Sequence, residues 1–70
     1  MKQIALKPDT PNILTHIRGS KGLTQQAAAD KAGMALVTWQ RVESDPFNER
    51  IGRLNAVLTV LGIPWKEVLR

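Results

Sequence analysis

The chain has 70 residues, no cysteine, and ten Lys and Arg against six Asp and Glu, which gives a formal net charge of +4. A chain of this length forms one small domain that buries about 60% of its unfolded surface, so a deep catalytic cleft is not expected. The lack of cysteine excludes disulfides and thiolate metal sites and fits a reducing cytosol. The positive charge favours a polyanionic partner such as nucleic acid, although many small basic proteins bind none.

Neither a membrane span nor a secretion signal is expected. The longest mostly apolar stretch, residues 56–65, is interrupted by Thr59, Gly62 and Pro64 and is too short to cross a bilayer. In the N-terminal MKQIALKPD, a lysine and a proline bracket a hydrophobic run that is too short for a signal peptide. These features predict a cytoplasmic protein with no membrane partner.

Residues 11–70 are expected to form one all-α domain, preceded by an N-terminal arm of residues 1–10. The arm would be flexible or would carry a short strand over residues 2–6, the only strand-like pattern in the chain. The sequence contains no internal repeat and no low-complexity tract.

The first helix is predicted over residues 11–21. Thr10 followed by Pro11 indicates its start, because proline at the first helical position has no amide to leave unpaired and already holds a helical φ. Gly22 indicates its end. Its inward face would be formed by Ile13, Leu14 and Ile17.

A second helix is predicted over residues 25–32, and a turn at Gly33 would join it to a third. Thr24 is a candidate N-cap, because its hydroxyl can accept a hydrogen bond from an unpaired amide of the first turn. Gly33 would end the helix because glycine adopts positive φ without a steric penalty. Small side chains on one side would let another helix approach closely: Ala28, Ala29 and Ala32.

The third helix, over about residues 35–43, would have an inward and an outward side. Trp39 and Val42, at i and i+3, would face the interior. Two short helices joined by a glycine-centred turn have the layout of a DNA-reading helix-turn-helix. The outward residues, left free to contact a partner, would be Leu36, Val37, Gln40 and Arg41.

Two further helices are predicted after the loop signals in SDPFNE. The fourth runs over about residues 50–61 and ends at Gly62, and Pro64 begins a short fifth helix over residues 65–69. The apolar stripe of the fourth helix would consist of Ile51, Leu54, Leu58 and Leu61, widened by Val57 and Val60.

We expect no enzymatic activity, no cofactor and no metal site. His16 is the only histidine, and it is expected at the surface of the first helix, without a cysteine or a carboxylate cluster at ligand spacing. Asp30 and Glu43 are not a credible catalytic pair, and the sequence contains no nucleophile motif and no glycine-rich phosphate loop.

Three separated segments share one known pattern: IRGSKGLTQQAAADKAG, TWQRVE and LNAVLTVLGI. Together they resemble the small helical DNA-binding domain of phage repressors, Cro proteins and Xre-type bacterial regulators. The resemblance covers about residues 11–69. It implies a five-helix, lambda-repressor-like fold whose second and third helices form the helix-turn-helix.

The resemblance also implies an ion pair. Members of the family pair an arginine late in the first helix with a glutamate that ends the recognition helix, and by position these are Arg18 and Glu43. In the alternative interpretation, both are ordinary solvated surface charges.

DNA contacts follow from the resemblance by position. Gln25 matches a glutamine that hydrogen-bonds a phosphate in the family, where the helix N-terminus adds its amides and partial positive charge. Arg41 would read guanine, whose O6 and N7 match the guanidinium fork. The base contacts would be Leu36, Val37, Gln40 and Arg41, and the backbone contacts Gln25, Thr38, Arg50 and Arg53, with Gln40 also suited to the backbone.

Several of these positions have an alternative interpretation. Leu36 and Val37 replace more usual polar residues, so they would press against thymine methyl groups or exclude wrong bases, or else pack partly into the core. In the alternative for Gln25, this residue begins its helix and has no special role. In the alternative for Arg50 and Arg53, both lie on a solvated face.

Two departures from the family concern packing. Ala28 stands where leucine is usual, and Trp39 where a smaller aliphatic residue is usual. If the two positions meet, the volume lost at one is recovered at the other, and packing density is kept.

The C-terminal residues predict a homodimer interface. Trp65 has little chain left to cover it, and an apolar cluster at an open edge suggests association. In the alternative, Trp65 or Val68 covers the core of a monomer. The interface candidates are Val57, Trp65, Val68 and Leu69.

Two functions therefore follow from the sequence. The first is a sequence-specific, nucleoid-associated transcriptional regulator that acts as a repressor and binds a double-stranded DNA operator as a homodimer through the major groove. The second is a protein-interaction module on the same scaffold, such as an antitoxin-like partner of a toxin, with DNA binding secondary. Steep salt dependence of duplex binding would separate the two, because only phosphate contacts release counterions.

Overall fold

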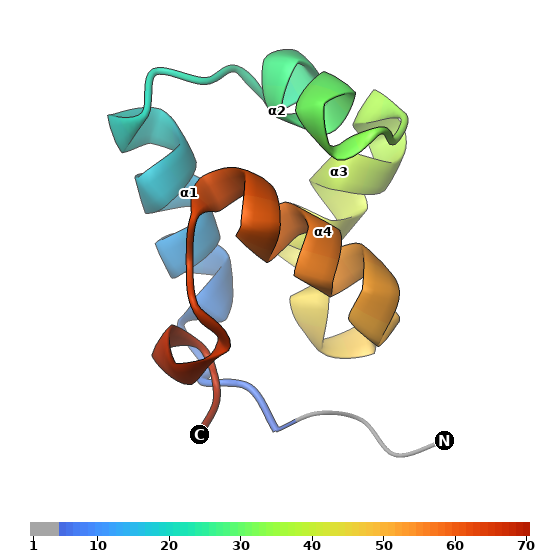
Figure 1. Ribbon diagram of the computed structural model, residues 1–70. Coiled ribbons are helices and arrows are strands. Elements are labelled where there is room, and N and C mark those ends of the chain that lie inside the picture. Colours follow the sequence, from blue (N-terminus) through green and yellow to red (C-terminus); the bar gives the residue numbers. More distant parts are fainter. Residues whose placement is uncertain (1–4) are drawn as a thin grey trace.

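The computed structural model describes residues 5–70, and over this range the chain is all-helical (Figure 1). Its principal extents are 30 × 22 × 17 Å. None of its helices has the length and apolar character needed to cross a membrane. The α-helices are α1 (Thr10–Ser20), α2 (Gln25–Ala32), α3 (Leu36–Ser44) and α4 (Ile51–Leu61), and the 3-10 turns are η1 (Pro46–Asn48) and η2 (Trp65–Glu67).

The ends of α2 are set by the residues that the sequence indicated. The Thr24 hydroxyl accepts a hydrogen bond from the Ala27 amide at 3.0 Å, so this N-cap is confirmed. Gly33 ends the helix at φ +69°. The amide of Met34 then donates to the carbonyl of Ala29 at 3.0 Å, a hydrogen bond typical of a helix that ends at a glycine.

The predicted fifth helix over residues 65–69 is wrong, because the structure has only the single 3-10 turn η2 there. The chain after this turn extends and pairs with the N-terminal segment. The Lys7 amide donates to the Val68 carbonyl at 2.7 Å, and the Arg70 amide donates to the Ala5 carbonyl at 3.1 Å. In a continued α-helix the Arg70 amide would instead donate to the carbonyl four residues earlier, that of Lys66.

The N-terminal arm is therefore held against the C-terminus over its described part. Leu6 forms an isolated antiparallel bridge with Leu69 and is 5% exposed. The first helix begins at Thr10, within the range assigned to the arm. The rest of the predicted strand, residues 2–4, lies outside the described residues.

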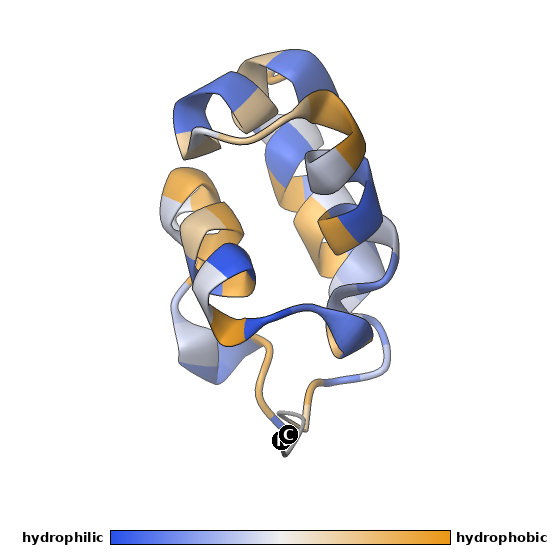
Figure 2. Ribbon diagram, turned by 90° about the vertical axis from the view of Figure 1, so that its right-hand side faces the viewer, coloured by the Kyte–Doolittle hydropathy of each residue, from blue (hydrophilic) through white to orange (hydrophobic). Residues whose placement is uncertain are grey.

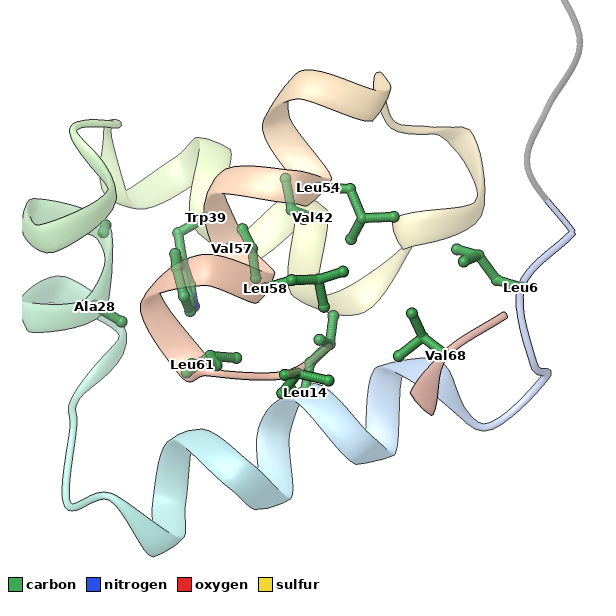
Figure 3. Close-up of a cluster of buried hydrophobic side chains, with 12 residues drawn as sticks. Leu6, Leu14, Ala28, Trp39, Val42, Leu54, Val57, Leu58, Leu61 and Val68 are labelled. Atoms are coloured by element: carbon green, nitrogen blue, oxygen red, sulfur yellow. The ribbon is translucent and has the colours of Figure 1, made fainter. Parts of the chain in front are cut away.

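Helices α1, α2 and α3 all contact α4, and their buried sides form the core together with it. The helices carry both hydrophobic and hydrophilic segments, as expected for amphipathic helices (Figure 2). Trp39 and Val42 are fully buried, as predicted. Ala28 is buried in the same cluster as Trp39, so the small and the large side chain share one packed interior (Figure 3). The other core residues include Leu6, Leu14, Leu54, Val57, Leu58, Leu61 and Val68.

For three residues, the burial or exposure predicted from the sequence is wrong. Ile51, predicted on the buried stripe of α4, is 56% exposed, because it is the first residue of the helix and lies one turn before Leu54, where the buried stripe begins. Val57 and Val68, predicted in a dimer interface, have no exposed surface. They fill the core of a single chain and cannot contact a second one without unfolding.

Candidate nucleic-acid interface

One side of α3 is left open to solvent. Val37, Gln40, Arg41 and Ser44 are exposed, and their spacing of three and four residues places them on one stripe. Val37 is 60% exposed. The opposite side of the helix carries Trp39, Val42 and Glu43, which are buried.

A buried carboxylate fixes the inward side of α3. Glu43 is 4% exposed, and its Oε2 lies 3.0 Å from Arg18 Nε, so the predicted ion pair is present. Glu43 Oε1 also accepts from Arg18 Nη2 at 3.1 Å and from the Thr15 hydroxyl at 2.9 Å. The indole of Trp39 donates to Oε2. Arg18 Nη1 donates to the Leu23 carbonyl at 2.8 Å, which adds the loop before α2 to the network.

The surroundings of Glu43 favour its charged form. Burial by itself would raise the pKa of this carboxyl, but hydrogen bonds from Arg18, Thr15 and Trp39 and the positive charge of Arg18 outweigh burial. The pKa of Glu43 is therefore lowered from its ordinary value of 4.5. The carboxylate stays ionised, and it keeps α1 and α3 in a fixed relation.

The N-terminus of α2 lies beside the open stripe of α3. Gln40 Nε2 donates to Gln25 Oε1 at 3.3 Å across the two helices. Since this oxygen is engaged, the amide nitrogen of Gln25 keeps its two N–H donors for another acceptor. The amides of Ala27 and Ala28 are bonded to Thr24, so the unpaired first-turn amides are those of Gln25 and Gln26.

A shallow hollow of about 270 Å³ opens where these helices meet α1. Its walls include Asn12, Gln25, Gln40 and Ser44, and the Arg18–Glu43 pair forms part of its lining. The two charges of this pair compensate each other, and the polar side chains of the lining can form hydrogen bonds.

The three arginines predicted to contact DNA differ in whether a nearby carboxylate already compensates their charge. Arg41 and Arg50 are exposed, and neither forms an ion pair within residues 5–70. Arg53 is 47% exposed, but its Nη1 lies 3.6 Å from Oε1 of Glu49, whose side chain is 6% exposed. The charge of Arg53 is thus partly compensated inside the chain, which the (i, i+4) spacing of the two residues indicates in the sequence.

The remaining predicted contacts are less accessible. Leu36 and Thr38 are half-buried at the start of α3. Trp65 is half-buried and donates its indole N–H to Asn55 Oδ1 at 2.9 Å, and Leu69 is 37% exposed. Of the four predicted interface residues, only these last two have surface to offer a second chain.

Sequence reasoning missed two partners of the buried carboxylate. Trp39 lies four residues before Glu43, a spacing that could have indicated the contact. Thr15 lies 28 residues away and carries no such signal.

His16 is exposed on α1, and within residues 5–70 no group of three His, Cys, Asp or Glu side chains is placed to hold a metal ion. Comparison with protein-family models finds none that matches the chain, and no curated protein matches its sequence. The interpretation of the site therefore rests on the chemistry of its residues.

Proposed function

We propose that the chain is a sequence-specific, double-stranded DNA-binding transcriptional regulator that acts by occupying an operator. The observation that carries this proposal is the open stripe of α3, Val37, Gln40, Arg41 and Ser44, beside the N-terminus of α2. In this proposal α2 and α3 are the two helices of a helix-turn-helix, and α3 lies in the major groove.

The inner side of α3 supports this role. A recognition helix must present its side chains to the base edges in one orientation, since a small rotation would change every contact. Glu43 ties α3 to α1 through Arg18 and Thr15, and Trp39 fixes the same helix in the core. These contacts hold the buried side of α3 in place and thereby fix the orientation of its open stripe.

Different parts of the proposed interface would contact different parts of the DNA. The free N–H groups of Gln25 and of the first turn of α2 suit a phosphate oxygen. Arg41, exposed and without an ion pair in the described chain, suits guanine O6 and N7. Arg50, at the N-cap of α4, would add a phosphate contact, and the net charge of +4 would attract duplex DNA from a distance.

Selection of bound sites from random duplex DNA, followed by titration of the selected and a scrambled duplex over a range of salt, tests the proposal. Arg41→Ala should cost about 1 to 3 kcal/mol on the selected site and relax preference at one base position. Arg50→Ala should weaken binding to both duplexes and lower the salt slope by about one per subunit. Arg53→Ala should lower the slope less, because Glu49 already compensates part of its charge.

Lys66→Ala is the matched control. It removes the same charge from an exposed position on η2, near the C-terminal end that lies away from α2 and α3 (Figure 1). This variant should keep the sequence preference. Binding that lacks both a selected sequence and a salt slope would contradict the proposal and favour the protein-interaction module.

A further inference from the structure

Val37 is the most exposed of the large hydrophobic residues in the described chain, at 60%. It lies in the first turn of α3, on the same stripe as Gln40, Arg41 and Ser44. The other residues of this stripe are polar or charged, so Val37 is its only apolar side chain. A partner that covers it needs one small apolar group surrounded by hydrogen-bonding groups, rather than an apolar protein face.

The major groove of duplex DNA offers such a group. The C5-methyl of thymine is the apolar feature of the base-pair edges there, and the other edges present hydrogen-bond donors and acceptors. Valine forms no side-chain hydrogen bond, so pressing it against those edges would leave polar groups unpaired. The β-branched side chain is also stiff at χ1, which keeps its methyl groups in a defined place.

We propose that Val37 selects a pyrimidine with a C5-methyl group in each half-site, either thymine or 5-methylcytosine. The inference rests on the proposed function, because it names a base read by the same surface. Val37 and Arg41 are four residues apart, which is about 6 Å along the helix axis. The methylated pyrimidine therefore lies within about two base pairs of the base that Arg41 reads, since base pairs are about 3.4 Å apart.

Base analogues in the selected site test this inference. Each thymine of one half-site is replaced in turn by deoxyuridine, which removes the methyl group and keeps the base pair, and affinity is measured by fluorescence anisotropy. At one position the affinity should fall about fourfold, the factor expected for losing the burial of one methyl group. At the same position, a 5-methylcytosine–guanine pair should bind about fourfold more tightly than an unmethylated one.

Variants connect the effect to Val37. In Val37→Ser, which changes an exposed side chain, thymine and deoxyuridine should bind equally at that position. Ile51→Ser changes a similarly exposed apolar residue on α4 and should leave the fourfold ratio unchanged. Loss of the ratio in Leu36→Ser but not in Val37→Ser would overturn the assignment to Val37.

The experiment distinguishes a failure of the inference about Val37 from a failure of the proposed function. A site that is bound with sequence preference but is insensitive to deoxyuridine, or that contains no thymine in its half-sites, overturns the role of Val37 and leaves the proposed function standing. Absence of any selected site overturns the proposed function and this inference with it.

Discussion

At the scale of single residues, Glu43 is the side chain on which the position of α3 most depends. It is nearly fully buried and accepts hydrogen bonds from α1 and from its own helix. A buried charge is tolerated only while its partners remain. We therefore expect Glu43 and Arg18 to matter for folding, not for DNA contact.

Removing either member of the ion pair should destabilise the chain strongly. Arg18→Ala strands a buried carboxylate and Glu43→Ala strands a guanidinium that is 16% exposed, and each change should cost about 3 to 5 kcal/mol. Urea and thermal unfolding measure the effect. Arg50→Ala removes an exposed arginine without an ion pair in the described chain and should change stability by no more than about 0.5 kcal/mol. Arg18 and Glu43 variants that unfold like the parent would contradict the role of the pair.

Acid should remove the contribution of Glu43. Its pKa in the folded chain lies below the value of 4.5 that applies when the chain is unfolded. The unfolded state therefore binds the proton more readily, and stability falls as the pH drops below about 4.5 and through the folded-state pKa. Above this range the contribution is fully present.

Urea unfolding of the parent and of Glu43→Gln, from pH 7 down to pH 3, isolates this effect from that of the other carboxylates. The difference in unfolding free energy between the two proteins should be constant near neutral pH and should shrink in acid. A difference that stays constant down to pH 3 would show that Glu43 keeps an ordinary pKa.

At the scale of elements, the turn between α2 and α3 depends on a backbone conformation. Gly33 has φ +69°, where a Cβ atom is strained even though nothing lies within 4 Å of it. Gly33→Ala should therefore destabilise the chain by about 1 to 2 kcal/mol. Gly52→Ala is the control, because Gly52 lies within α4 at a negative φ with open space around it, and alanine should stabilise the helix by about 0.5 to 1 kcal/mol. Equal effects in unfolding experiments would mean that the conformation of the turn is not limiting.

At the scale of the whole molecule, burial restricts where two copies can meet. Val57 and Val68 are inside the chain, so a homodimer at the C-terminal edge would use Trp65 and Leu69. One recognition helix covers few base pairs, and we expect two copies to read half-sites about one helical turn, roughly 34 Å, apart.

Sedimentation with the selected duplex measures this stoichiometry. The parent should bind as two copies per site, and Leu69→Lys, which changes a side chain that is 37% exposed, should weaken the assembly without unfolding the chain. A complex of one copy per site in the parent contradicts the dimer. An unchanged assembly in Leu69→Lys would place the contact elsewhere.

The sequence by itself determined the local features of this protein. Thr24 and Gly33 indicate the ends of α2, and Trp39 and Val42 indicate which side of α3 faces inward. These features depend on side-chain chemistry and spacing within one or two helical turns, which the sequence shows directly. The same spacing predicted the exposure of Val37, Gln40 and Arg41 correctly, whereas Leu36, also predicted outward, is half-buried.

Only the tertiary structure decided which apolar residues near the chain ends are covered. Leu6 pairs with Leu69 directly after the turn η2, and Val68 beside this pair is buried. The hydrogen bond from Thr15 to Glu43 joins residues 28 positions apart. Such contacts depend on how distant segments pack. The apolar stripe of a helix does not by itself show which of its residues another segment covers, as the exposed Ile51 demonstrates. Burial on one helix is set by the neighbours that the fold supplies.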